Sequence, residues 1–153
     1  MSIHYDTHTP AVRLGDHLPA IVNPALDRTT LALFAGASGD HMRLHIDTDF
    51  ARRAGMADVF GHGMLSMAYL GRLLTDWAPQ ARLRQFNARF AGITHLGNVI
   101  TCGGRVTAIA DGDGETMVTL ELRAYTQYGD SKTVGEAVIA LPASIAPHPS
   151  APF

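Results

Sequence analysis

Apolar residues in the first half of the chain recur at the spacing of an α-helix. A helix with Thr29 or Thr30 as its N-cap and Gly39 as its stop accounts for the segment LALFAGAS. Its shared face would carry Leu31, Phe34, Ala35 and Ser38. A shorter helix is expected over Asp49–Ala54, where Gly55 ends it. The first half is therefore predicted to form two short helices joined by a loop.

The next helical segment, GMLSMAYLGRLLTDW, is the most informative and begins near Gly63. It is apolar on nearly every face as far as Arg72, a pattern typical of a buried helix. A single sheet covers only one side of a helix, so another face would stay uncovered in a monomer. We therefore expect a second subunit to cover that face, in a homodimer or a higher homo-oligomer.

After Pro79 the apolar period changes to two, which is the period of a β-strand. Strands are predicted in QFNARFAGI, NVITCGGRVTAI, TMVTLELRAYT and KTVGEAVIAL, with turns at DGDG and QYGD. Residues predicted to share one face are Phe86, Ala88 and Phe90 in the first strand, Ile100, Cys102, Val106 and Ala108 in the second, and Val118, Leu120, Leu122 and Ala124 in the third. Short connections favour antiparallel neighbours. The pattern predicts an α+β fold with the long helix on one antiparallel sheet.

The length of 153 residues indicates one domain over residues 1–153, with 1–11 and the proline-rich 142–153 as peripheral ends. A hydrophobic content of 46% excludes a disordered chain. Twelve basic residues against 14 acidic ones give a net charge of −2. A nucleic-acid-binding protein typically has an excess of basic residues, and this chain has none.

No segment reaches the roughly 20 apolar residues of a membrane-spanning helix. The N-terminal MSIHYDTHTP has no basic region followed by an apolar run, so it does not resemble a signal peptide. The single cysteine, Cys102, cannot form an internal disulfide and is typical of a reducing compartment. We expect a cytoplasmic protein with no nucleic-acid or membrane partner.

The segment SGDHMRLH, residues 38–45, places an acid and an imidazole just after a predicted helix end. If the Asp40 carboxylate and the His45 imidazole lie together, they can orient a water molecule and remove its proton. A loop at a helix end leaves such side chains free to face a ligand. Such pairs are common, so the spacing alone favours a solvated helix-ending aspartate with an incidental histidine and leaves the catalytic pair as the alternative.

The segment FGHGML, residues 60–65, places His62 between two glycines where the long helix begins. Gly63 has no side chain, so a ligand oxygen can approach its N–H at the positive end of the helix dipole. Such a donor is what a thioester oxyanion requires. His62 and Met64 are further candidates for substrate contact. A closely packed turn would use the same glycines, so this interpretation is also open.

A metal site is a third idea, because His41 and His45 are four residues apart beside Asp40. Gly39 argues against a helix at this point, and no glutamate follows the first histidine as an HExxH motif requires. We therefore expect no metal. Cys102, on the inward face of a strand, is interpreted as an unreactive core residue.

Together, FAGASGDHMRLH, DTDFARRAG and GHGML resemble the MaoC-like family of enoyl-thioester hydratases and dehydratases. The resemblance implies a hot-dog fold, in which an antiparallel sheet wraps around a long central helix. It also implies reversible addition of water across the 2,3 double bond of an acyl-CoA or acyl-carrier-protein thioester, without a metal or redox cofactor. Asp40 and His45 match the catalytic pair, and Gly63 matches the glycine whose amide binds the thioester carbonyl.

One departure from the family pattern lies between the two members of this pair. Met42-Arg43 stands where the family has Asn-Pro. Arg43 is able to contact a charged group of the substrate or carrier, or to pair with a surface acid. The residues expected around the acyl group are Met64, Met67, Ala68 and Gly71.

Two other functions remain open. Hot-dog thioesterases commonly carry an acid on the central helix, and the first acid on this helix is Asp76, far from its start. The other alternative is a catalytically silent subunit that binds acyl thioesters within a heteromeric hydratase. The Met42-Arg43 departure favours it, whereas the intact Asp40 and His45 argue against it.

Overall fold

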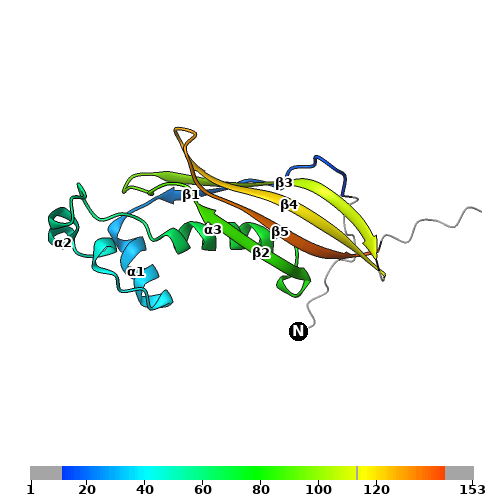
Figure 1. Ribbon diagram of the computed structural model, residues 1–153, viewed down its shortest axis with the longest axis horizontal. Helices are drawn as coiled ribbons and strands as arrows, with labels where there is room; N and C mark the ends of the chain where they lie inside the picture. Colours follow the sequence, from blue (N-terminus) through cyan, green and yellow to red (C-terminus); the bar gives the residue numbers. More distant parts are fainter. Residues whose placement is uncertain (1–11, 113, 144–153) are drawn as a thin grey trace, which may run out of the picture.

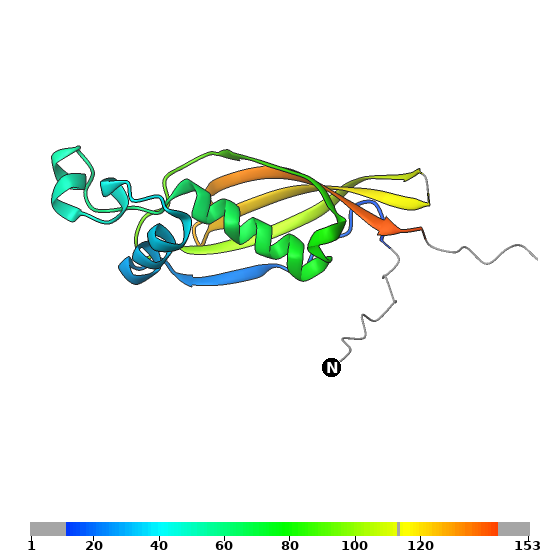
Figure 2. The ribbon, with the colours of Figure 1, turned by 90° about the horizontal axis from the view of Figure 1, so that it is seen from below.

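A computed structural model describes residues 12–112 and 114–143. Its centre is a five-stranded antiparallel sheet in the order β1-β3-β4-β5-β2, with helix α3 along one face (Figures 1 and 2). The elements are β1 (Ile21–Ala25), α1 (Arg28–Ser38), the 3-10 helix η1 (Arg43–His45), α2 (Thr48–Arg53), α3 (Gly63–Trp77), the 3-10 helix η2 (Gln80–Arg82), β2 (Leu83–Phe90), β3 (Val99–Gly112), β4 (Glu115–Thr126) and β5 (Ser131–Pro142). The predicted α+β arrangement is confirmed.

Helix α3 spans the predicted segment and packs one side of itself on the sheet. Leu70, Leu73 and Leu74 are at most 1% exposed and belong to the main core. Burying each leucine contributes about 1.5–3 kcal/mol, so this side fixes the helix on the sheet. The other side is open in the single chain, where Met64 is 51% exposed and Ala68 is exposed as well.

The alternation of β4 is confirmed, and that of β3 holds only for its first half. The buried residues of β4 include Val118, Leu120, Leu122 and Ala124. The prediction that Ala108 faces inward is wrong. The pairing of β3 with β4 shifts between Val106 and Ala108, which places Ala108 opposite Thr119 and leaves it exposed. A β-bulge of this kind reverses the alternation beyond it.

The sequence pattern does not predict β1, because its residues IVNPA do not alternate and include a proline. The strand lies at the edge of the sheet, where a residue without an N–H is tolerated. Its pairing with β3 shifts between Val22 and Ala25. Asn23 is buried and donates from Nδ2 to the main-chain oxygen of Ile100 at 2.9 Å, so a polar side chain helps to hold this edge.

The ends of the first two helices differ slightly from the prediction. Asp27, rather than Thr29 or Thr30, caps α1, because its side chain accepts a hydrogen bond from the Thr30 N–H at 2.7 Å. Gly39 ends this helix as predicted, in a left-handed conformation with φ of 73°. Helix α2 begins and ends one residue earlier than predicted. None of these shifts moves the loop that carries the candidate site.

The predicted peripheral ends lie almost entirely outside the described residues. Only Pro142, which ends β5, and Ala143 belong to the described part of 142–153. Within 12–112 and 114–143, no helix is long and apolar enough to cross a membrane. Cys102 is fully buried, and burial raises its pKa to about 11, which agrees with an unreactive core thiol. The cytoplasmic location stays a prediction.

Close packing of β5 on β2 gives a test of this sheet. A methyl group on Gly135 would overlap the main-chain oxygen of Asn87 on β2. We therefore expect Gly135→Ala to destabilise the protein by about 1–3 kcal/mol, measured by thermal or urea unfolding. Gly103→Ala in β3 is the matched control, because a methyl group there meets no atom of the described residues within 4 Å. Equal stability of the two variants would contradict this register.

Candidate functional site

The loop between α1 and η1 carries Asp40 and is held by local hydrogen bonds. The Asp40 N–H donates to Ser38 Oγ at 3.2 Å, and the Ser38 hydroxyl donates to the Phe34 main-chain oxygen at 2.7 Å. The Asp40 carboxylate accepts from the Met42 N–H through Oδ1 at 3.2 Å. One carboxylate oxygen is thus used in shaping the loop, and the half-exposed side chain keeps further acceptor capacity.

His45, the last residue of η1, is oriented by the segment before α3. Its Nδ1 lies 2.8 Å from the main-chain oxygen of Phe60. A carbonyl oxygen only accepts, so Nδ1 carries the hydrogen and Nε2 of the neutral ring has a free lone pair. The Phe60 ring meets the His45 ring edge to face, with centroids 4.9 Å apart. The imidazole is therefore prepared to accept a proton at Nε2.

His62 lies immediately before α3 and contacts both predicted site residues. Its Nε2 donates to the main-chain oxygen of Asp40 at 3.2 Å, and its ring stacks on His45 with centroids 4.0 Å apart and planes 30° apart. The residue is 1% exposed. Burial, and secondly the neighbouring His45, lower the pKa of His62, so its ring stays neutral at neutral pH.

Three side chains that are distant in the sequence therefore meet at one place. Asp40, His45 and His62 each offer one ligand-type atom, and these atoms lie within 4.8 Å of one another. Such side chains also occur around zinc. Here, however, the Nε2–H of His62 is already donated to a carbonyl oxygen. His41, the other histidine of the metal hypothesis, is exposed. The expectation of no metal stays a prediction.

Gly63 is the first residue of α3 and is exposed. An N–H in the first turn has no acceptor within its own helix, so this one is available to a ligand. The side chain of His62, the N-cap residue, makes no capping hydrogen bond. A methyl group on Gly63 would lie 3.2 Å from the Phe90 ring, so the β2 edge approaches the helix start closely.

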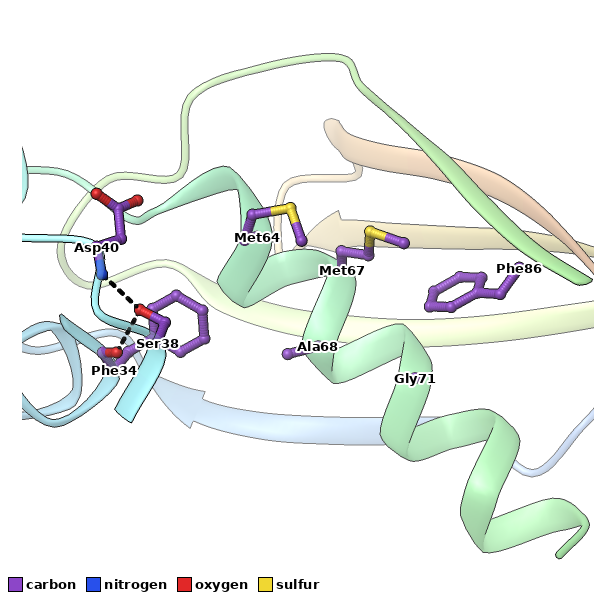
Figure 3. Close-up of a pocket in the computed structure, with 8 residues that line it drawn as sticks. All are labelled: Phe34, Ser38, Asp40, Met64, Met67, Ala68, Gly71 and Phe86. Carbon is purple, nitrogen blue, oxygen red and sulfur yellow. Dashed lines mark hydrogen bonds between the residues drawn. The ribbon is translucent and has the colours of Figure 1, made fainter. Parts of the chain in front are cut away.

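An apolar cavity of about 430 Å³ runs along the open side of α3 from Asp40 (Figure 3). Its lining residues are Phe34, Ser38, Asp40, Met64, Met67, Ala68, Gly71 and Phe86. In the close-up, Asp40 lies at the end near Met64, and Phe86 lies at the other end, beyond Met67. All four residues expected around the acyl group contribute to the wall.

The sequence prediction did not include Phe34 and Phe86 in this cavity. The signal was present, because both residues belong to predicted apolar faces, of a helix and of a strand. The sequence pattern does not reveal the packing that brings Phe34 of α1 and Phe86 of β2 to the same cavity beside α3. Apolar residues line most of the wall, and the Asp40 carboxylate stands at one end, an arrangement common in ligand pockets.

The structure shows what Met42 and Arg43 contact. The Arg43 guanidinium pairs with Asp47 at 2.6 Å and lies 4.6 Å from the centroid of the Phe50 ring. Arg43 therefore pairs with a surface acid, one of the two alternatives, and this exposed pair adds little to stability. Met42 is 53% exposed and contributes its N–H to Asp40.

Known proteins resemble this chain over most of its length. Residues 10–127 match the family model described as MaoC like domain. The (R)-specific enoyl-CoA hydratase of Aeromonas caviae is 32% identical over 115 residues, which make up 73% of this chain and 84% of that protein. The 3-oxo-4,17-pregnadiene-20-carboxyl-CoA hydratase beta subunit of Mycobacterium tuberculosis is 29% identical over 108 residues, covering 70% of this chain and 81% of that protein.

The solved structures agree with the sequence comparison. The (R)-hydratase from A. caviae involved in PHA biosynthesis superposes with a TM-score of 0.74 at 26% identity, covering 86% of this chain and 98% of that one. This likeness, together with the sheet and its helix, confirms the hot-dog fold.

Proposed function

The chain belongs to the MaoC-like domain family of hydratases and dehydratases, and on that premise we propose that it hydrates enoyl thioesters and dehydrates 3-hydroxyacyl thioesters. The carrier is coenzyme A or acyl carrier protein. One observation carries the proposal: Asp40 and His45 converge where an apolar cavity approaches the start of α3. That combination provides an acid–base pair, a place for an acyl chain and a main-chain donor.

In the hydration direction, Asp40 and His45 share one water molecule. His45 Nε2 accepts a proton from the water while the Asp40 carboxylate accepts a hydrogen bond from the remaining O–H, so the water oxygen gains hydroxide character and bonds to Cβ. The released proton is then delivered from the pair to Cα, and the hydroxyl group remains on Cβ. Dehydration follows the same steps in reverse.

Negative charge collects on the thioester oxygen between the two bond-forming events. The N–H of Gly63 donates to that oxygen, at the positive end of the α3 dipole. Met64 contacts the acyl chain where it leaves the thioester, and the cavity beyond holds the rest. This chemistry proceeds through proton transfer and one oxyanion, so the proposed reaction calls for no metal or redox cofactor.

A silent subunit of a heteromeric hydratase is the second candidate. It is favoured by the similarity to a protein named as a hydratase beta subunit. The thioesterase alternative has less support, because the first acid of α3, Asp76, comes near the end of that helix. The proximity of the Asp40 and His45 side chains supports the hydratase over both alternatives.

Replacing the carboxylate tests the catalytic pair. We expect Asp40→Asn to lower kcat for hydration of short and medium enoyl-CoA thioesters by about 10²–10⁴-fold, followed through the loss of enoyl absorbance. Asp76→Asn, an identical change at an exposed position of α3, is the control and keeps wild-type activity. Equal, negligible rates for all three proteins would support the silent subunit. Thiol release from a saturated acyl-CoA, independent of Asp40 and His45, would indicate a thioesterase.

Two substitutions at one position isolate the main-chain donor. Gly63→Pro removes the N–H but suits the first position of a helix, because His62 before it is extended, with φ of −56° and ψ of 134°. Gly63→Ala keeps the N–H and, like the proline, adds a Cβ atom that contacts the Phe90 ring. We expect the proline variant to be about 10²–10³-fold slower than the alanine variant in steady-state assays. Matching rates would exclude the Gly63 N–H as the oxyanion donor.

We also propose a homodimer, in which the partner covers the open side of α3. Met64 and Ala68 are exposed there, and the helix start at Gly63 lies close to Phe90, which is 49% exposed on the edge strand β2. Light scattering at micromolar concentration is expected to give at least twice the chain mass of 16.4 kDa. A single-chain mass under these conditions would contradict the proposal.

A further inference from the structure

His62 takes part in no step of the proposed reaction, yet it contacts both residues that do. It is 1% exposed and lies outside the wall of the cavity, so it does not face an acyl chain. It contacts the main chain of Asp40 through a hydrogen bond and the ring of His45 through a stack. Asp40 and His45 reach the site from the α1–η1 loop and η1, whereas His62 is anchored at the start of α3.

The hydrogen bond from His62 restrains the backbone of the loop between α1 and η1, which carries Asp40. The Nε2–H of His62 donates to the Asp40 main-chain oxygen at 3.2 Å, across 22 positions in the sequence. The other bonds that hold Asp40 come from Ser38 and Met42, both within two residues. Local bonds shape the loop, whereas the bond from His62 fixes the loop relative to the helix that carries Gly63.

The ring stack with His62 restrains His45, the second residue of the proposed catalytic pair. The His45 ring lies against the His62 ring at 4.0 Å and meets the Phe60 ring edge to face at 4.9 Å. Phe34 packs in turn on His62, with centroids 5.0 Å apart. Together with the Nδ1 bond to the Phe60 oxygen, these contacts leave His45 little freedom to rotate its ring.

Keeping a histidine here has a cost that an apolar residue would avoid. The Nδ1 of His62 is buried and has no hydrogen-bond partner among the described residues. A buried polar atom without a partner destabilises the folded state. The ring nevertheless supplies both a donor at Nε2 and a flat stacking surface, and no apolar side chain supplies both.

We propose that His62 is a positioning residue that holds the Asp40 carboxylate and the His45 imidazole in register with the Gly63 N–H. The inference rests on the proposed hydratase function. It assigns His62 to the support of the catalytic pair instead of direct contact with substrate.

Two variants separate the contributions of His62. His62→Phe keeps an aromatic ring beside His45 but removes the donor, and it also removes the unpartnered Nδ1. His62→Gln keeps an amide donor close to the position of Nε2 but removes the ring. His62→Leu takes the place of the phenylalanine variant if the larger ring prevents folding. His17→Gln, at an exposed position outside the site, is the matched control.

Steady-state kinetics of the variants should show an effect on kcat and little effect on KM. We expect His62→Phe to lower kcat by about 10–100-fold with KM near the wild-type value, because a support residue shifts the pair without touching the acyl pocket. His62→Gln should recover much of the loss. The melting temperature of His62→Phe should equal or exceed that of the wild type. Unchanged kcat in His62→Phe would overturn the proposal, as would falls in activity that match falls in stability in both variants.

Amide hydrogen exchange gives a second result that does not need turnover. In His62→Phe, exchange should become faster over residues 40–45, while the second half of α3 stays protected. Unchanged exchange over residues 40–45 would overturn the proposal even if the wild type fails to hydrate every enoyl-CoA tested. Such a failure, with faster exchange in the variant, would count against the proposed function and support the positioning role.

Discussion

The one-sided burial of helix α3 on the sheet is the constraint from which the site follows. Leu70, Leu73 and Leu74 hold the helix against the inner faces of the central strands. With its axis fixed, its first residue and the His62 before it are fixed too. The side turned away from the sheet remains open, and that side forms a wall of the cavity. One packing interaction thus provides both the donor at Gly63 and the space beside it.

The remaining chemistry reaches this helix start from an irregular part of the chain. Gly39 ends α1 in a left-handed conformation, and the loop after it carries Asp40 toward His62. His45 is held by the main-chain oxygen of Phe60, in the segment before α3. Because the contacts of His62 reach Asp40, 22 positions away, and also Phe34 in α1, no single element builds the site. Its geometry depends on α1, η1 and α3 keeping their relative positions. The contacts of the His62 ring with the rings of Phe34 and His45 stabilise these positions.

The sequence predicted what local pattern determines and missed what packing determines. The extent of α3 follows from a long apolar segment that begins at a glycine turn, and the inward face of β4 follows from periodicity. The edge strand β1 has no alternation, and the bulge before Ala108 depends on pairing with β4. Asp40 and His45 were identified by type and spacing, and the family resemblance favoured their pairing. That His62 would be buried behind both depends on the packing of three segments, which spacing does not reveal.

The proposed mechanism requires Asp40, His45 and the Gly63 N–H to act on one thioester. A crystal structure of Asp40→Asn bound to a 3-hydroxyacyl-CoA would show whether they do. We predict the thioester oxygen at about 2.7–3.1 Å from the Gly63 nitrogen, with the 3-hydroxyl group between position 40 and His45 Nε2. A bound thioester whose oxygen faces away from α3, or whose hydroxyl group lies beyond the reach of His45, would contradict the claim.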